Sequence, residues 1–164
     1  MWCLRVNREG SPPVEGVDWQ RFLKLAESHG VRPLVHQALA EASPPELTQF
    51  FRANAIHTLY LTAELLRVLR LLDAQGIRAV PLKGPALAQS LYGDLALREF
   101  SDLDVLVQET DLRKARDLLE AQGYHLDAAL DPRGEAAHIR NDQDYPFRPP
   151  AKGILIALHW RFPP

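Results

Sequence analysis

Apolar residues in the first half of the chain recur at the spacing of α-helices. A helix is predicted over residues 19–29, with Asp18 as its N-cap and an apolar face formed by Trp19, Phe22, Leu23 and Ala26. A short second helix is predicted over residues 33–41, before the prolines at 44 and 45. A long third helix is predicted over residues 45–75, on a stripe that includes Leu47, Phe51, Leu59, Leu66 and Leu72.

The pattern changes after Gly76, where short apolar runs alternate with amphipathic stretches. Strands are predicted over residues 77–82, 102–107, 124–127 and 154–160. Helices are predicted over residues 85–92 and 111–122, and residues 128–144 are polar without a clear period. Strands that alternate with helices predict α/β packing in this half of the chain.

The fold class predicted by these patterns is α/β, of the α+β kind, with a helical segment before the strands. A loose segment is expected over residues 1–16, which carry two glycines and two prolines. The helical segment is expected over residues 17–75 and the α/β core over residues 76–164.

Composition narrows the class of protein only slightly. Apolar residues make up 46% of the 164 residues and charged residues 24%, which is typical of a globular protein and excludes a disordered one. The formal net charge of −2 gives no field that would attract a nucleic acid or an anionic membrane. No basic stripe with interleaved aromatic residues is present, so we do not expect a long nucleic acid as a partner.

The location predicted from the sequence is cytoplasmic. The single cysteine, Cys3, excludes an internal disulfide and a thiolate metal site, and no apolar segment follows the charged start as in a signal peptide. Glu64, Arg67 and Arg70 interrupt the most apolar long stretch, residues 59–72. A membrane-spanning helix needs about 20 apolar residues, so no membrane association is expected.

Two acids mark the most informative strand. Asp102 and Asp104 are two positions apart, so their carboxylates leave the same face of a strand, while Leu103 and Val105 leave the other. Such a pair holds one metal ion or bridges two, and without a cation the two carboxylates repel each other. Because the donors are hard oxygens with no histidine or cysteine at ligand spacing, we expect Mg²⁺ or Mn²⁺.

A second motif precedes these acids and suits a phosphate. Lys83 and Gly84 end a strand, and Pro85 suits the first position of a helix. The glycine allows a phosphate to approach the backbone, and the start of the helix offers free N–H groups. Lys83 or Arg98 would add a positive charge to a phosphate or pyrophosphate. A phosphate cradle beside a carboxylate pair is the arrangement of metal-dependent nucleotidyl transfer.

Several short motifs together resemble a known family. They are LKGPAL at 82–87, LYGD at 91–94, LR at 97–98, SDLDVLV at 101–107 and LHWR at 158–161. In this order they are similar to the uncharacterised nucleotidyltransferase family of the DNA polymerase β-like superfamily, over about residues 75–162. The resemblance implies a small mixed-sheet core flanked by helices, with a nucleoside triphosphate and Mg²⁺ bound at Asp102 and Asp104. A hydroxyl would then attack the α-phosphate, and pyrophosphate would leave.

The chain departs from the pattern of that superfamily in ways that affect the expected activity. Pro85 stands where a serine is common, so a phosphate-binding hydroxyl is missing, and the spacing from Gly84 to Asp102 is long. A third carboxylate is expected at the position of Ala157, and His159 on the same strand face would replace it only in part. Because family members continue after this strand, the core is expected to be incomplete at its C-terminus.

Each candidate residue also has a purely structural interpretation. Lys83 and Gly84 suit an ordinary turn, and Arg98 would pair with Asp94 or Glu99 as a surface charge. His159 and Trp160 would be packing residues. The polar residues His138, Asp142 and Asp144 suit a solvated loop, although one of the acids would be a substitute for the missing carboxylate if it folded beside Ala157.

The function predicted from the sequence is transfer of a nucleoside monophosphate group to an unknown hydroxyl acceptor, preferably on a small molecule or a protein. The alternatives are a catalytically degenerate nucleotide- or metal-binding module and a helical protein-interaction module. Apolar surface left by an incomplete core would favour a homodimer.

Overall fold

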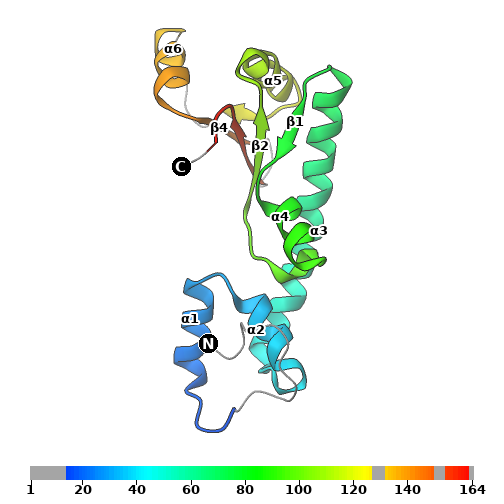
Figure 1. Cartoon of the computed structure of the whole chain (residues 1–164), viewed down its shortest axis with the longest axis vertical. Helices are drawn as coiled ribbons and strands as arrows, with labels where there is room; N and C mark the ends of the chain where they lie inside the picture. The colour runs from blue at the N-terminus through cyan, green and yellow to red at the C-terminus, as the bar shows by residue number, and fades with distance from the viewer. Residues whose placement is uncertain (1–13, 127–131, 150–153, 163–164) are drawn as a thin grey trace. The chain divides into compact units, whose positions relative to one another are not determined.

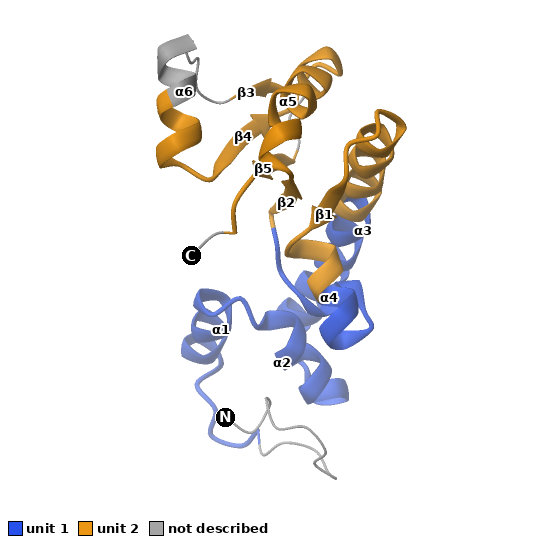
Figure 2. Cartoon of the chain, turned by 45° about the horizontal axis from the view of Figure 1, so that its top comes forward, with its two compact units in different colours: residues 1–60, 88–100 blue, residues 61–87, 101–164 orange. Residues whose placement is uncertain are grey.

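Helices and one mixed β-sheet build the chain (Figure 1). The structure is a computed structural model that describes residues 14–126, 132–149 and 154–162. Contacts divide the chain into two compact units, both discontinuous in sequence (Figure 2). Unit 1 comprises residues 1–60 and 88–100, and unit 2 comprises residues 61–87 and 101–164. The predicted mixed α+β class, with helices before the sheet, is confirmed.

Unit 1 is helical and has its own apolar core. It holds α1 (Trp19–Ser28), α2 (Arg32–Leu39), η2 (Ala40–Ala42), η3 (Leu95–Leu97) and the first part of α3 (Pro45–Ala74). The predicted cap of α1 is confirmed, because the Asp18 carboxylate accepts a hydrogen bond from the Arg21 backbone N–H at 3.1 Å. The core residues are Ala26, Val35, Leu39 and Leu47.

Unit 2 holds the sheet, whose strand order is β1-β2-β5-β4-β3. The strands are β1 (Ala79–Pro81), β2 (Asp102–Val107), β3 (His125–Leu126), β4 (Asp144–Arg148) and β5 (Leu155–His159). β2 and β5 are parallel, and the other three pairs are antiparallel. The helices are η4 (Glu109–Asp111), α5 (Leu112–Ala121), α6 (Pro132–Asn141), the end of α3 and the start of α4 (Gly84–Tyr92).

The strand register gives the sheet two different faces. The apolar face consists of residues that are at most 3% exposed: Leu103, Val105, Val107, Tyr145, Phe147, Ile156 and Leu158. Helices α3 and α5 contribute buried leucines and small residues to the same unit, as expected for a helix-covered sheet face. The opposite face, called the acidic face below, carries Asp102, Asp104, Leu106, Leu155, Ala157 and His159.

Residues 128–144, which the sequence left without a period, contain two elements. From residue 132 onward they form α6 and the first residue of β4. β4 is an interior strand, although Pro146 stands in its middle and pairs with Ala157. Proline is normally confined to sheet edges and bulges, because it has no backbone N–H to donate to a neighbouring strand. A proline at this position therefore argues against a strand when only the sequence is considered. The strand predicted over 124–127 is present as β3, and residue 127 lies outside the described residues.

The other predicted elements are confirmed with small shifts at their ends. The strand over residues 102–107 is β2 with the same bounds, and the helix over 85–92 begins one residue earlier, at Gly84. Among the described residues, none of the helices combines the length and apolarity that crossing a membrane requires.

Candidate functional site

The two acids predicted to hold a metal lie on β2, as their spacing indicates. Asp102 pairs in register with Leu155 of β5, and Asp104 pairs with Ala157, so both carboxylates stand on the acidic face. Asp102 is half-buried, and no residue in the described part of the chain donates a hydrogen bond or forms an ion pair with its carboxylate. Asp104 is 7% exposed. The strand therefore presents one accessible acid next to one enclosed acid.

The enclosed acid is held by a histidine from the neighbouring parallel strand. His159 Nε2 lies 2.8 Å from Asp104 Oδ1, and the histidine is itself buried. The other ring nitrogen, Nδ1, is buried without a hydrogen-bond partner among the described residues. Lys83 Nζ lies 3.9 Å from the same Oδ1 and keeps about half of its side chain exposed. Asp104 is thus contacted by two of the residues that the sequence singled out.

The Lys83–Gly84 turn is placed beside Asp104 by the sheet itself. β1 pairs with β2, and the pairing continues with a hydrogen bond from Leu82 N–H to the Asp104 carbonyl at 3.0 Å. Gly84 then starts α4 with a φ of +52°, a left-handed conformation that glycine adopts freely. The first N–H groups of a helix lack intrahelical partners, although Pro85 contributes none. The turn therefore brings one ammonium group to the acidic face, and α4 begins at the residue that follows Lys83.

Replacement of Gly84 by alanine tests whether this turn serves a ligand. The positive φ predicts a loss of about 1–2 kcal/mol in unfolding free energy, because an L-residue is strained there. Gly76→Ala is the matched control, since Gly76 has a φ of +68° at the end of α3. Thermal unfolding should show similar losses for both variants, whereas only Gly84→Ala should weaken nucleotide binding. Equal nucleotide affinity in the two variants would leave Gly84 with a structural role alone.

Ala157 occupies the position where the sequence expects a third carboxylate. Its methyl group stands on the acidic face, directly in register with Asp104. Asp144 of β4 shares this face and pairs with His159 of β5, but β4 lies two strands from β2, which is a separation of roughly 9–10 Å. Asp142 Oδ2 lies 2.7 Å from His138 Nδ1, and that imidazole stacks on Tyr145 of the apolar face. Neither acid lies beside Asp104, so the structure supplies no substitute for the missing carboxylate among these residues.

Arg98 belongs to unit 1, unlike the other predicted site residues. The surface ion pairs that the sequence suggests for it are not formed, because Asp94 caps the Ala96 N–H and Glu99 pairs with Arg32. One guanidinium nitrogen of Arg98, Nη1, is buried without a hydrogen-bond partner among the described residues. A role of Arg98 toward phosphate stays a prediction.

The donor set suits a hard divalent cation in part. Within the described ranges, no group of three or more histidine, cysteine or acidic side chains is arranged to hold a metal ion. Two carboxylates on one strand face nevertheless fit Mg²⁺, which is commonly held by one or two carboxylates and completed by water and substrate phosphates. The site therefore fits a cation that arrives with a phosphate ligand better than a resident structural metal.

Comparison with known proteins agrees with this architecture. A family model described as uncharacterised nucleotidyltransferase matches residues 15–164. The chain belongs to this nucleotidyltransferase family, which confirms the resemblance inferred from the motifs. No curated protein matches the chain.

Proposed function

We propose that this protein transfers a nucleoside monophosphate group from a nucleoside triphosphate to a hydroxyl of a small molecule or protein. Membership of a nucleotidyltransferase family supports the reaction class. The observation that carries the proposal is the proximity of Lys83 to the acids of β2. Lys83 Nζ lies 3.9 Å from Asp104 Oδ1, and Asp102 stands on the same face of β2. The weakly acidic overall charge favours a small molecule or protein over a long nucleic acid as acceptor.

The chemical step is a displacement at phosphorus. The acceptor oxygen forms a bond to the α-phosphorus, and its hydroxyl proton passes to solvent. The bond from the α-phosphorus to the oxygen that bridges to the β-phosphate breaks, and pyrophosphate leaves with the bonding electron pair. The chain's own contribution is to position the triphosphate and to keep its charge balanced while this exchange takes place.

Asp102 and Asp104 would hold Mg²⁺ or Mn²⁺. When bound, such a cation neutralises developing negative charge on the phosphates. Lys83 and the N–H groups at the start of α4 would bind the outer phosphates, and Arg98 would add a further charge-assisted hydrogen bond. Asp102 is suited to direct contact because its carboxylate is accessible and unpartnered among the described residues.

His159 would act as a positioning residue for Asp104. Its Nε2 donates to one carboxylate oxygen, Oδ1, which restricts rotation of the carboxylate. Hydrogen bonds of this kind orient metal ligands, and their removal typically weakens metal affinity 10- to 100-fold.

The expected result for His159→Ala is therefore Mn²⁺ affinity about 10- to 100-fold below that of the unmodified protein, measured by calorimetric titration with nucleotide present. His138→Ala is a suitable control, because His138 is a half-buried histidine that contacts the apolar face instead. The positioning role fails if both variants bind Mn²⁺ as the unmodified protein does.

A thermal-shift measurement tests the proposed function directly. Each of the four nucleoside triphosphates is added with and without Mg²⁺, at about 100 times its dissociation constant. Binding at that ratio stabilises the folded state by about 2.7 kcal/mol, a shift of about 5–10 °C for a chain of this size. A shift that requires Mg²⁺ is expected, and the absence of any shift with all four nucleotides would contradict the proposal.

A second function is favoured by one observation, the alanine at position 157. A site with two carboxylates instead of three suits a module that binds a nucleotide without transferring it. The two functions differ in turnover. If the protein is an enzyme, incubation with a nucleoside triphosphate labelled at the α-phosphate releases pyrophosphate and labels an acceptor; if it only binds the nucleotide, neither product forms.

A further inference from the structure

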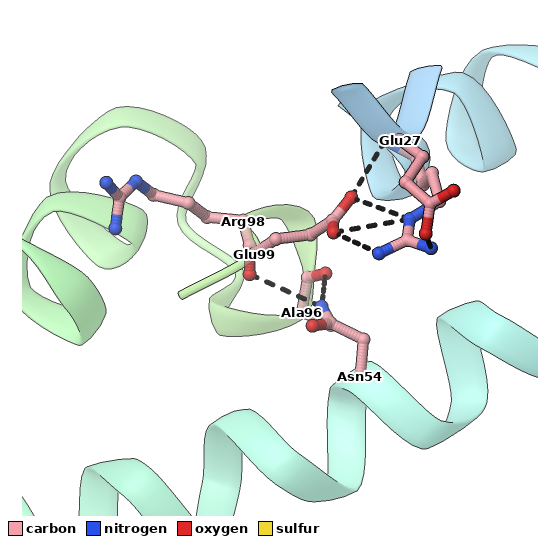
Figure 3. Close-up of polar contacts among 6 residues, drawn as sticks. Glu27, Asn54, Ala96, Arg98 and Glu99 are labelled. Atoms are coloured by element: carbon pink, nitrogen blue, oxygen red, sulfur yellow. Dashed lines mark hydrogen bonds and ion pairs between the residues drawn. The ribbon is translucent and has the colours of Figure 1, made fainter. Parts of the chain in front are cut away.

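The segment that leads into β2 is fixed from inside unit 1 by a buried asparagine (Figure 3). Asn54 lies on α3 and is 7% exposed. Its Nδ2 donates to the carbonyl of Ala96 at 2.9 Å and to the carbonyl of Arg98 at 3.3 Å. The backbone on both sides of Leu97 is therefore held by one side-chain amide.

The following residue, Glu99, is fixed from α2. The Arg32 guanidinium donates to both Glu99 carboxylate oxygens, with its shortest contact, from Nη2, at 2.6 Å. The Arg32 backbone N–H donates to the same carboxylate at 3.1 Å, and the guanidinium lies over the Phe50 ring. The hydrogen bond to Glu99 raises the pKa of Arg32 above its ordinary value. Glu99 is thus held by several contacts from α2.

Arg98 stands between these two attachments, yet its side chain takes part in neither. Figure 3 shows the Arg98 and Glu99 side chains extending in opposite directions from the backbone. Arg98 Nη1 is buried without a hydrogen-bond partner among the described residues. A buried donor without a partner destabilises the folded state, and more so when it is charged, so a partner that accepts hydrogen bonds is expected there. A guanidinium fork matches the oxygens of phosphate.

We infer that Asn54 is a positioning residue that presents Arg98 to a phosphate group of the nucleoside triphosphate. This inference rests on the proposed function. Three observations carry it: the two hydrogen bonds of Asn54, the independent attachment of Glu99, and the unpartnered Arg98 Nη1.

A double-mutant cycle tests the inference on the full chain. Binding of ATP, GTP, CTP and UTP with Mg²⁺ is measured by calorimetry for four proteins: unmodified, Arg98→Ala, Asn54→Ala and the double variant. Loss of charge-assisted hydrogen bonds predicts about 10- to 100-fold weaker binding for Arg98→Ala. Asn54→Ala should weaken binding about 10-fold, and the double variant should bind no more weakly than Arg98→Ala, because Asn54 acts through Arg98.

Matched variants separate positioning from general loss of structure. Glu27→Gln removes an exposed ion pair of Arg32 at 2.8 Å but leaves Glu99 in place, so its nucleotide affinity should be unchanged. Asn54→Leu is similar in shape and removes both donor hydrogens without burying a charge, so it should behave like Asn54→Ala. If Asn54→Ala does not fold, Asn54→Leu carries the same comparison, with thermal unfolding to establish that each variant is folded.

The possible failures have different meanings. Unchanged affinity in Asn54→Ala, when Arg98→Ala binds weakly, overturns the positioning role and leaves the proposed function intact. Independent, multiplicative losses in the double variant overturn it too, as does full affinity in Arg98→Ala. Failure of the unmodified protein to bind any of the four nucleotides instead refutes the proposed function, and this inference with it.

Discussion

Replacement of Asp102 by asparagine is expected to lower nucleotidyl transfer about a thousandfold while leaving the fold intact. A catalytic cation contributes several kcal/mol of transition-state stabilisation, and each 1.36 kcal/mol corresponds to a factor of ten in rate. Asp102 is half-buried and forms no hydrogen bond or ion pair among the described residues, so its loss removes no structural contact of the carboxylate. The rate is measured as pyrophosphate release, and the fold by thermal unfolding.

Substitutions of two other acids on the same sheet face serve as comparisons for this experiment. Asp104→Asn should also abolish transfer, but it disturbs a buried contact with His159 at 2.8 Å, so a lower melting temperature is expected as well. Asp144→Asn is the control, because Asp144 lies on the same sheet face two strands away. If Asp144→Asn reduced transfer as strongly as Asp102→Asn, the acids of β2 would not be the specific metal ligands.

Replacement of Ala157 by aspartate is expected to raise the transfer rate, by about 10- to 100-fold. The new carboxylate would stand on the acidic face in register with Asp104, where the sequence pattern expects a third acid. Without a cation, three carboxylates repel each other, so the variant should unfold at a lower temperature than the unmodified protein. Mg²⁺ should restore that stability, because it binds the folded state alone.

Asparagine at the same position separates charge from size. Ala157→Asn adds nearly the same volume at this 7% exposed position without adding a charge, so it should lower stability regardless of Mg²⁺. An Ala157→Asp protein that gains neither Mg²⁺-dependent stability nor transfer would show that the third carboxylate is not what limits this site. The nucleotide-binding module would then be the better description.

The local elements and the carboxylate pair could be predicted because their signals are local. A period of two fixes the side-chain faces of β2, and the apolar alternation of Leu103, Val105 and Val107 leaves only one face for Asp102 and Asp104. The long helix α3 has an equally plain apolar stripe, and Gly84 at a positive φ agrees with the turn that its sequence predicts.

The contacts that complete the site depend on pairing between distant segments, which the sequence does not reveal. His159 reaches Asp104 only because β5 aligns parallel to β2 with Ala157 opposite that acid. The sequence gives no signal for the role of Asn54, because a single polar residue within an apolar helical stripe is compatible with many structural roles. Its partners are backbone carbonyls more than 40 residues away, and backbone carbonyls carry no sequence signal.

The interleaving of the two units has a consequence for synthesis of the chain. Unit 1 needs residues 88–100, which emerge from the ribosome only after α3 and β1. Until then, Asn54 lacks the carbonyls of Ala96 and Arg98, and Arg32 lacks Glu99. The polar contacts of Asn54 and Arg32 with this segment therefore form only after the segment just before β2 has been made, later than the apolar core of unit 1 is available.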